Sequence, residues 1–218
     1  MKFDFSKIQN FDNHIKLSIP DYDSLSNIFK HLALRYADTS QPIVDLGCST
    51  GRFLLSLKDH TDQLLMGVDE ISTHMPNDVD NVKFIDIDAN QFFRANRNHQ
   101  FSVIVSMFFL QFLNKRIRRS VLEYIEEQVR GGATLLISEK VYLPDVKLHQ
   151  AISRLHIQNK REKFSDTEIL DKEKAMEDSM FCVVSTELEN ELKQMGKVSK
   201  VWQSYNFMGY VVRRHDGI

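Results

Sequence analysis

Residues 43–51 read IVDLGCSTG, an apolar run that ends near an aspartate and then turns through two glycines. A short run of branched apolar residues is typical of a buried strand, and glycine marks the turn that follows it. In open α/β sheets, ligands bind at the carboxyl ends of the strands, beside the first strand-to-helix turn. The stretch therefore predicts both the fold class and the edge of the sheet at which a ligand binds.

The rest of the chain alternates between two kinds of pattern. Buried-strand composition occurs at residues 64–68, 82–85, 101–107, 133–138, 198–205 and 207–213. Helical spacing occurs at residues 23–38, 116–129, 146–163, 166–181 and 186–195. Buried strands that alternate with helices predict an α/β fold, a mostly parallel, seven-stranded, doubly wound sheet that ends in a β-hairpin.

Length and composition favour a single domain. The chain has 218 residues, 42% of them hydrophobic, and can bury a sizeable core. We expect a helical cap at 1–40, a cofactor-binding core at 41–138, a helical insertion at 139–195 and a terminal hairpin at 196–218. A net charge of −2 gives no overall attraction to nucleic acid or membrane. Two cysteines, with no signal peptide or long apolar run, predict a cytoplasmic protein without a membrane partner.

The glycine turn does not fit two common nucleotide motifs. A P-loop requires Gly-Lys-Ser/Thr, whereas Gly51 is followed by Arg52. A dinucleotide turn requires a glycine at the position of Ser49, so that a pyrophosphate can approach the backbone. The remaining pattern, D-x-G-x-x-x-G from Asp45 through Gly47 to Gly51, is the turn of enzymes that bind S-adenosylmethionine (SAM). SAM carries no phosphate, and such a loop can bind its methionyl carboxylate and ammonium groups.

Two further acids follow the next two predicted strands. Asp69 lies 18 residues after Gly51, close to the spacing of an acid that binds a ribose hydroxyl. Asp88 follows the third strand, where its carboxylate could accept a hydrogen bond from an adenine amino group. Each acid alone could equally be a solvated strand end or a helix N-cap. Three acids after three successive strands indicate a SAM site.

Further motifs span most of the chain. They are FDFSKIQNFDNHIKLSIPDY (3–22), FFLQFL (108–113), GGATLLISEK (131–140), FSDTEI (164–169) and WQSYNFMGYVV (202–212). Together with VDLGCSTG, this set resembles the carboxy-S-adenosylmethionine (carboxy-SAM) synthase family. The resemblance implies a Rossmann-like class I methyltransferase fold and a homodimer. It also implies synthesis of carboxy-SAM from SAM and prephenate, for the 5-oxyacetic acid modification of wobble uridine in tRNA.

The resemblance also implies roles for individual residues. Tyr22 would contact the cofactor, which is SAM, or S-adenosylhomocysteine as the product. Gly47, Cys48 and Ser49 would lie along its methionyl end. Ribose would bind Asp69 and Glu70, and adenine would bind Asp88 and Ala89. Asp45 and Gly51 complete the predicted site as parts of the turn itself.

Two positions depart from the family pattern. An ungapped alignment of EILDKEKAMEDSM puts Glu173 where the family has an arginine that binds the added carboxylate of carboxy-SAM. Met107 stands where the family has an asparagine. A glutamate repels a carboxylate that an arginine would bind through two hydrogen bonds. We therefore expect this protein to prefer SAM, unless the alignment slips by one residue and brings Lys172 or Lys174 to the site.

Other features carry weaker predictions. Two basic clusters could bind RNA phosphates, although such runs are more often solvated helix faces. They comprise Lys115, Arg116, Arg118 and Arg119, and Lys160, Arg161 and Lys163. Three aromatic residues, Phe108, Phe109 and Phe112, could stack an acceptor base but more often pack in a core. The histidines show no metal-binding spacing, so no metal site is expected.

Three functions stay open from the sequence. The first is a SAM-dependent methyltransferase-type enzyme that transfers a one-carbon group to an unidentified, tRNA-related acceptor. The second is carboxy-SAM synthesis. The third is a non-catalytic SAM-binding scaffold. Methyl transfer from a sulfonium depends mainly on proximity and orientation, so an enzyme of this kind requires no conspicuous catalytic triad. No catalytic residue is predicted.

Overall fold

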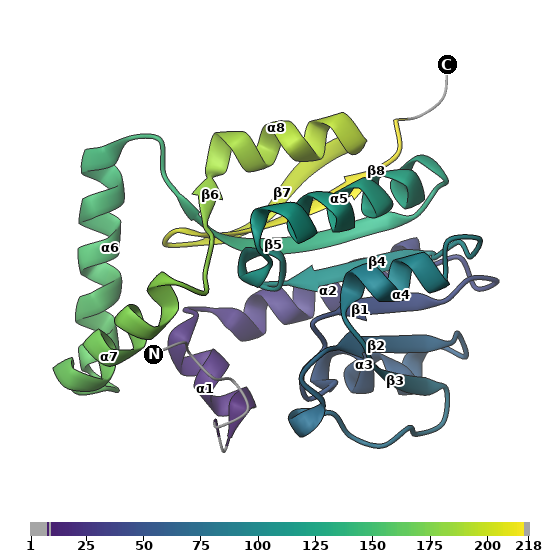
Figure 1. Ribbon diagram of the computed structural model, residues 1–218, viewed down its shortest axis with the longest axis horizontal. Helices are drawn as coiled ribbons and strands as arrows, with labels where there is room; N and C mark the ends of the chain where they lie inside the picture. Colours follow the sequence, from purple (N-terminus) through teal and green to yellow (C-terminus); the bar gives the residue numbers. More distant parts are fainter. Residues whose placement is uncertain (1–7, 9, 216–218) are drawn as a thin grey trace.

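The structure, a computed structural model, describes residue 8 and residues 10–215. Those parts of the predicted cap and terminal hairpin that fall on residues 1–7, 9 and 216–218 lie outside the described residues. The described chain forms one α/β sheet with helices on both faces, as Figure 1 shows. None of its helices is both long enough and apolar enough to cross a membrane.

The sheet has seven strands in one continuous path, in the order β3-β2-β1-β4-β5-β8-β7. In chain order the strands of the described residues are β1 (Ile43–Leu46), β2 (Leu65–Asp69), β3 (Val82–Asp86), β4 (Val103–Met107), β5 (Thr134–Tyr142), β6 (Val183–Val184), β7 (Lys197–Ser204) and β8 (Phe207–Arg213). The short β6 pairs with the end of β5, off this path. Pairing is parallel from β3 to β5 and antiparallel at β8 and β7. The predicted Rossmann-like class I methyltransferase fold is confirmed, and β6 is an addition to it.

The strand order reverses direction at β1. From β1 the chain builds outward through β2 and β3 on one side, and returns to place β4 and β5 on the other. Both β2 and β4 pair with β1 in parallel, so Asp45 lies level with Gly67 and Val105. A crevice opens at the carboxyl ends of the strands where connections diverge in this way. The stretch at residues 43–51 therefore lies at the binding edge of the sheet.

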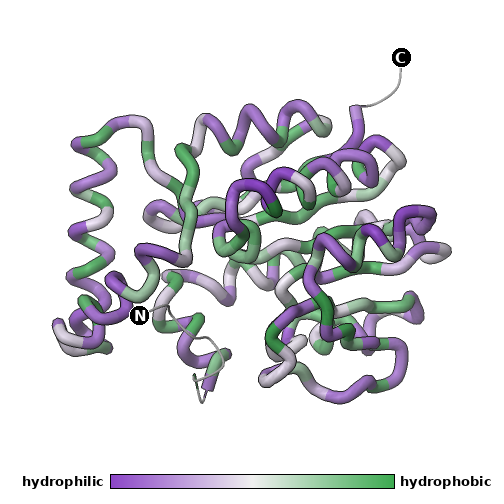
Figure 2. The backbone as a smooth tube through the Cα atoms, in the orientation of Figure 1, coloured by the Kyte–Doolittle hydropathy of each residue, from purple (hydrophilic) through white to green (hydrophobic). Residues whose placement is uncertain are grey.

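Helices cover the two faces of the sheet unequally. They are α1 (Phe11–Ser18), α2 (Tyr22–Tyr36), α3 (Arg52–Leu57), α4 (Ala89–Ala95), α5 (Lys115–Arg130), α6 (Val146–Arg161), α7 (Asp166–Glu177) and α8 (Ser185–Met195). The apolar sides of α4, α5 and α8 bury one face, and those of α2 and α3 bury the other. In Figure 2 the strands are richer in apolar residues, and the outer helices are more hydrophilic. Helices α6 and α7 project beyond the sheet, next to α1 (Figure 1).

The predicted helix at 166–181 is too long by four residues. A capping box at Ser165 and Glu168 starts α7 as the sequence leads one to expect. The helix ends at Glu177 because the chain turns back to the core, where the Phe181 N–H donates to the Gln111 carbonyl at 2.6 Å. This return brings Val183 and Val184 beside β5 as β6. A tertiary contact thus overrides a helical pattern.

Arg118 is not part of an exposed basic surface. Its side chain is buried, and its guanidinium lies 3.3 Å from the Glu139 carboxylate and 3.1 Å from that of Glu191. Burial raises the pKa of Glu139 to about 7, although the nearby Arg118 cation lowers it. The first predicted RNA-binding cluster therefore loses one member, which instead joins α5 to β5 and α8.

We predict that Arg118→Met destabilises the fold by about 3–5 kcal/mol at pH 8, because it leaves Glu139 charged and buried. The loss should shrink at pH 5.5, since Glu139 binds a proton below its folded pKa and the buried charge disappears. Urea unfolding at both pH values measures this. Arg119→Met, which affects an exposed pair with Glu123, is the matched control and should change stability by less than about 1 kcal/mol. An equal loss for both variants would contradict the buried ion pair.

Candidate functional site

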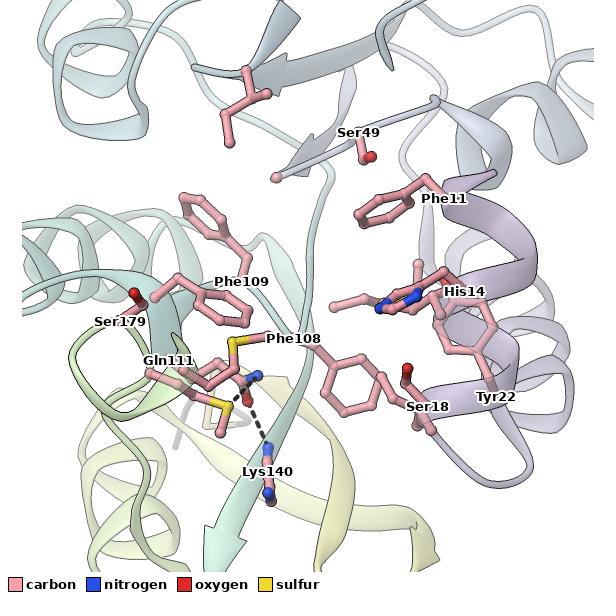
Figure 3. A pocket seen from close by; sticks show the side chains of 18 of the residues that line it. Phe11, His14, Ser18, Tyr22, Ser49, Phe108, Phe109, Gln111, Lys140 and Ser179 are labelled. Atoms are coloured by element: carbon pink, nitrogen blue, oxygen red, sulfur yellow. Dashed lines mark hydrogen bonds between the residues drawn. The ribbon is translucent and has the colours of Figure 1, made fainter. Parts of the chain in front are cut away.

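A cavity of about 950 Å³ opens at the carboxyl edge of the sheet. This volume lies at the upper end of the range for small-molecule pockets. Its lining comes from α1 and α2, the turn after β1, the ends of β2, β4 and β5, and helices α6 and α7. In Figure 3, Ser49 lies at one side of the cavity and Lys140 at another, with Phe108 and Phe109 between them.

The turn after β1 has a left-handed backbone at alternate residues. Gly47 has φ +73°, Ser49 has φ +48° and Gly51 has φ +67°. A Cβ atom at position 47 would lie 2.5 Å from the Phe109 ring, and one at position 51 would overlap the Phe84 ring. Both glycines are therefore required by backbone conformation and by space.

Most N–H groups of this turn already have partners within the protein. Those of Gly47 and Cys48 donate to the Val68 carbonyl at 2.8 and 3.2 Å, and that of Gly51 donates to the Cys48 carbonyl at 2.8 Å. The Ser49 N–H donates to the Asp69 carboxylate at 2.9 Å. A phosphate-binding loop needs such donors directed at its ligand. Their internal use agrees with a ligand that has no phosphate.

Asp69 joins the ends of the first two strands. One of its oxygens accepts the Ser49 N–H, and the other accepts the Ile71 N–H at 2.9 Å. Burial raises the pKa of Asp69, and the two N–H donors oppose that rise. Because an ionised carboxylate can accept about four hydrogen bonds, both oxygens keep capacity for ribose hydroxyls. The contact of Asp69 with ribose stays a prediction, and the sequence analysis did not foresee that this carboxylate joins the two strand ends.

The part of the cavity over β1 and β2 is acidic. Asp45, Asp69 and Glu70 line it, and this group is called the acidic end. Burial raises the pKa of Asp45 well above its usual value, and the charge on Asp69 raises it further. Burial and the nearby Asp45 also raise the pKa of Tyr22, which keeps its phenol neutral. Cationic groups on a ligand would relieve the repulsion between these carboxylates.

Helix α1 covers the cavity and joins its two sides. The Thr50 hydroxyl donates to Asp12 at 2.7 Å, which ties α1 to the glycine turn. On the other side, the Lys172 Nζ lies 2.7 Å from the His14 Nε2 and donates to the Ser18 hydroxyl at 2.8 Å. The N-terminal cap thus contributes lining residues that no local motif indicated.

The part of the cavity beyond β4 is basic. Lys140 from β5, Lys160 from α6 and Lys172 from α7 line it, and this group is called the basic end. Burial and the charges of the other two lysines lower the pKa of Lys172 to about 7. Burial and Lys140 likewise lower the pKa of Lys160, whereas Glu173 raises it. The three ammonium groups are therefore close enough to repel one another.

The structure brings most of the predicted site residues together. Seven of them line the cavity: Tyr22, Asp45, Gly47, Cys48, Ser49, Asp69 and Glu70. Gly51, Asp88 and Ala89 lie outside its lining. Asp88 caps α4, where its side chain accepts the Gln91 N–H at 2.9 Å, and the role of Asp88 in binding adenine stays a prediction. Cys48 is buried, and burial raises the pKa of its thiol, as suits a small packing residue rather than a nucleophile.

The two departures from the family pattern both lie at the cavity. Met107 lines its wall between the acidic and basic ends, beside Phe108. Glu173 also lines it, but this side chain is exposed, whereas the preceding Lys172 is half-buried. Successive residues of a helix point about 100° apart. Lys172 can therefore face into the cavity while the next residue, Glu173, lies at its rim.

Comparisons with known proteins support a single family. No family model matches the chain. A carboxy-S-adenosyl-L-methionine synthase from Aliivibrio salmonicida is 32% identical over 94% of this chain and 89% of its own length. The synthase of the same name from Hydrogenovibrio crunogenus is 27% identical over 96% of this chain and 88% of its own length.

Solved structures share the fold at low identity. An O-methyltransferase family protein from Burkholderia thailandensis aligns with a TM-score of 0.60 and 14% identity, over 95% of this chain and 59% of that one. Human N-acetylserotonin methyltransferase in complex with SAM aligns with a TM-score of 0.56 and 13% identity, over 89% of this chain and 55% of that one. These likenesses establish the class I methyltransferase fold. The sequence relatives establish more: the chain belongs to the carboxy-S-adenosyl-L-methionine synthase family and is a SAM-dependent transferase.

Proposed function

We propose that this protein transfers a one-carbon group from SAM to a second small molecule bound in the same cavity. The observation that carries this proposal is the separation of charge within the cavity. SAM has a cationic sulfonium and a cationic ammonium, which complement Asp45, Asp69 and Glu70 at the acidic end. Its methyl group would then point toward the apolar wall of Met107 and Phe108, between the two ends.

The wall residues suit this kind of chemistry. Displacement at a sulfonium methyl carbon needs the two reactants held in line, and it needs no protein nucleophile. Phe108 holds a left-handed backbone, with φ +55°, at the end of β4. Such a conformation is unfavourable for a large side chain and persists where the surrounding structure requires it. The Phe108 ring packs 5.8 Å from Phe207 and 6.4 Å from Tyr22, which fixes the wall.

A second candidate is the reaction named for the family, the synthesis of carboxy-SAM. The cavity lining from β5, α6 and α7 favours it, because its four lysines outnumber its two exposed glutamates, Glu173 and Glu177. A positive region suits a carboxylate-bearing substrate such as prephenate. A role in tRNA wobble-uridine modification would follow from this candidate. RNA itself has weaker support, since Arg118 is buried and Lys160 faces the cavity.

We predict that Asp69→Ala weakens SAM binding by about 1.5–3 kcal/mol, through loss of charge-assisted hydrogen bonds to ribose. It also releases the Ser49 N–H, so Asp69→Asn, which keeps one acceptor, should lose less. Isothermal titration calorimetry with SAM measures both variants. Asp59→Ala is a control on an exposed aspartate that does not line the cavity. Unchanged SAM affinity in Asp69→Ala would refute the position of the site.

We predict that the unmodified protein binds SAM more tightly than carboxy-SAM, and that Glu173→Arg raises affinity for carboxy-SAM alone. The substitution replaces repulsion at the cavity rim by attraction, and SAM has no added carboxylate to respond. Competition binding with the two ligands measures the ratio, with Glu162→Arg as an exposed control outside the cavity lining. Preference for carboxy-SAM in the unmodified protein, together with its formation from SAM and prephenate, would favour the second candidate.

Turnover separates both enzymatic candidates from a SAM-binding scaffold. With a suitable second substrate, methyl transfer releases S-adenosylhomocysteine and carboxy-SAM synthesis consumes SAM to form carboxy-SAM. A scaffold binds SAM but forms neither S-adenosylhomocysteine nor carboxy-SAM. Mass spectrometry of the nucleoside products after incubation with small-molecule and RNA fractions of a cell extract therefore distinguishes the three functions.

A homodimer formed through the helical insertion is the assembly that we propose. Large apolar side chains are exposed at eight positions in the described residues, and six of these lie within residues 142–181. They are Tyr142, Val146, Leu148, Leu155, Leu170 and Phe181. A concentration of exposed apolar side chains in one segment favours an interface there.

We predict a particle of about twice 25.5 kDa in light scattering at micromolar concentration. Leu155→Glu and Leu170→Glu, which introduce charge on α6 and α7, should shift the protein to a monomer because a buried unpaired charge opposes association. Leu64→Glu is the matched control, since Leu64 is also an exposed leucine but lies outside residues 139–195. A monomer for the unmodified protein would contradict this assembly.

A further inference from the structure

A second, smaller cavity opens at the amino edge of the sheet, and its volume is about 300 Å³. Its lining comes from the end of α2 and the loop after it, the residue before β4, the turn after α5, the start of β5 and the end of β8. Thr134 lines it, whereas Lys140, six residues further along β5, lines the first cavity. Six residues of a strand span about 20 Å, so the two cavities are separate. Figure 1 shows β8 ending on the side of the sheet away from α6 and α7.

Thr134 brings an unpartnered hydroxyl group to this second cavity. The residue is only 4% exposed, and its hydroxyl has no hydrogen-bond partner within the described part of the chain. The neighbouring buried Ser102 differs, because its hydroxyl donates to the Pro42 carbonyl at 3.1 Å. Buried polar groups normally have partners, since leaving one unpaired is costly. A ligand that accepts a hydrogen bond from Thr134 would remove this cost.

Two arginines line the same cavity. Arg213 is the last residue of β8, and Arg214 follows it. Neither forms an ion pair with any carboxylate of the described residues. The Arg213 guanidinium carbon lies 4.6 Å from the centre of the Tyr36 ring, and this contact restricts where the guanidinium can lie. The cavity therefore combines a buried neutral donor with two cations that lack an anion.

Asp38 is the acid in this lining, and it does not neutralise the arginines. Its Oδ1 atom accepts the Ser40 N–H at 3.0 Å and the Ser40 hydroxyl at 2.8 Å. These two bonds lower the pKa of Asp38, so the carboxylate stays charged. Two guanidinium groups and one carboxylate leave the lining with a net positive charge. The Oδ2 atom of Asp38 keeps capacity for a hydroxyl group of a ligand.

The shape of the donor set indicates the kind of anion. Guanidinium groups form paired hydrogen bonds with phosphate, and Thr134 adds a third donor from a different strand. A terminal phosphate presents three oxygens to such a set, whereas a carboxylate or a phosphodiester presents two. The volume lies at the lower end of the range for small-molecule pockets, which suits a small ester.

We infer that this second cavity binds a small phosphate monoester. Arg213 and Arg214 hold its phosphate oxygens, and the Thr134 hydroxyl donates to the same group. Asp38 accepts a hydroxyl of the organic part. The site shares no lining residue with the first cavity within the described part of the chain, so the inference does not depend on the proposed function.

Ribose 5-phosphate and ribose are matched probes that differ by the phosphate. Amide signals of the isotope-labelled full-length protein, followed by NMR at constant ionic strength, report on both cavities during each titration. We expect ribose 5-phosphate to shift the signals of Gly132 and Thr134 with a Kd of about 1 mM or below, and ribose to leave them unchanged. S-adenosylhomocysteine, added next, should shift the signals around Gly47 and leave the first shifts in place.

Three substitutions in the lining test the individual donors. Arg213→Gln and Arg214→Gln should each weaken ribose 5-phosphate binding at least tenfold, the effect of one charge-assisted hydrogen bond. Thr134→Val keeps the shape of the side chain and removes the hydroxyl, so it should weaken binding about fivefold. Arg97→Gln is the control, because Arg97 is exposed, lines neither cavity and carries the same charge.

Several results would overturn the assignment. They are the absence of a saturable shift with ribose 5-phosphate at ten times the expected Kd, an equal response to ribose, and retained affinity in both arginine variants. An equal loss of affinity in Arg97→Gln would also overturn it, because general charge would then explain the binding. An RNA oligonucleotide without a terminal phosphate that shifts the same signals, when ribose 5-phosphate does not, would assign the cavity to an RNA backbone instead. Failure of S-adenosylhomocysteine alone to bind would count against the proposed function and leave this site in place.

Discussion

The Asp69 carboxylate holds the binding edge of this protein in shape. It accepts the Ser49 N–H with one oxygen and the Ile71 N–H with the other, so it links the turn after β1 to the end of β2. The turn that it holds has a left-handed backbone at Gly47, Ser49 and Gly51, and Gly47 packs directly against the Phe109 ring. Because the turn's own N–H groups are used in this way, the site is adapted to a ligand without phosphate. The same carboxylate is the predicted ribose ligand, so the proposed ligand recognition would depend on the side chain that holds the turn.

The cavity extends this arrangement into two regions of opposite charge. Carboxylates from β1 and β2 form the acidic end, and lysines from β5, α6 and α7 form the basic end. An apolar wall from the end of β4 separates them, which is where the reacting carbon of SAM would lie. The helical insertion therefore lines the cavity and also carries the proposed dimer surface. Helix α1 bridges both regions through Asp12 and His14.

Local patterns predicted the core of the fold and the residues that line the acidic end of the cavity. The strand at 43–46 and the turn at 47–51 have signals confined to a few residues, and the structure has them at those positions. Arg118 was interpreted as part of a solvated run, yet its spacing to Val121, Leu122 and Ile125 places it on the buried side of α5. The convergence of Lys140, Lys160 and Lys172 could not be predicted, because three elements far apart in sequence supply one residue each. Asp88 shows why a single acid is ambiguous. An acid before a helix is a common N-cap, as Asp88 is for α4, and spacing in the sequence does not separate that role from ligand binding.

The central claim is that this cavity binds SAM, with its cationic centre between the acidic end and the apolar wall. Mass spectrometry of the small molecules released when the purified protein is denatured tests it most directly, followed by titration of the stripped protein with SAM. The account predicts SAM or S-adenosylhomocysteine in the released material, and one SAM bound per chain on titration. Release of a phosphorylated nucleotide in their place, or a stripped protein that does not bind SAM, would contradict it.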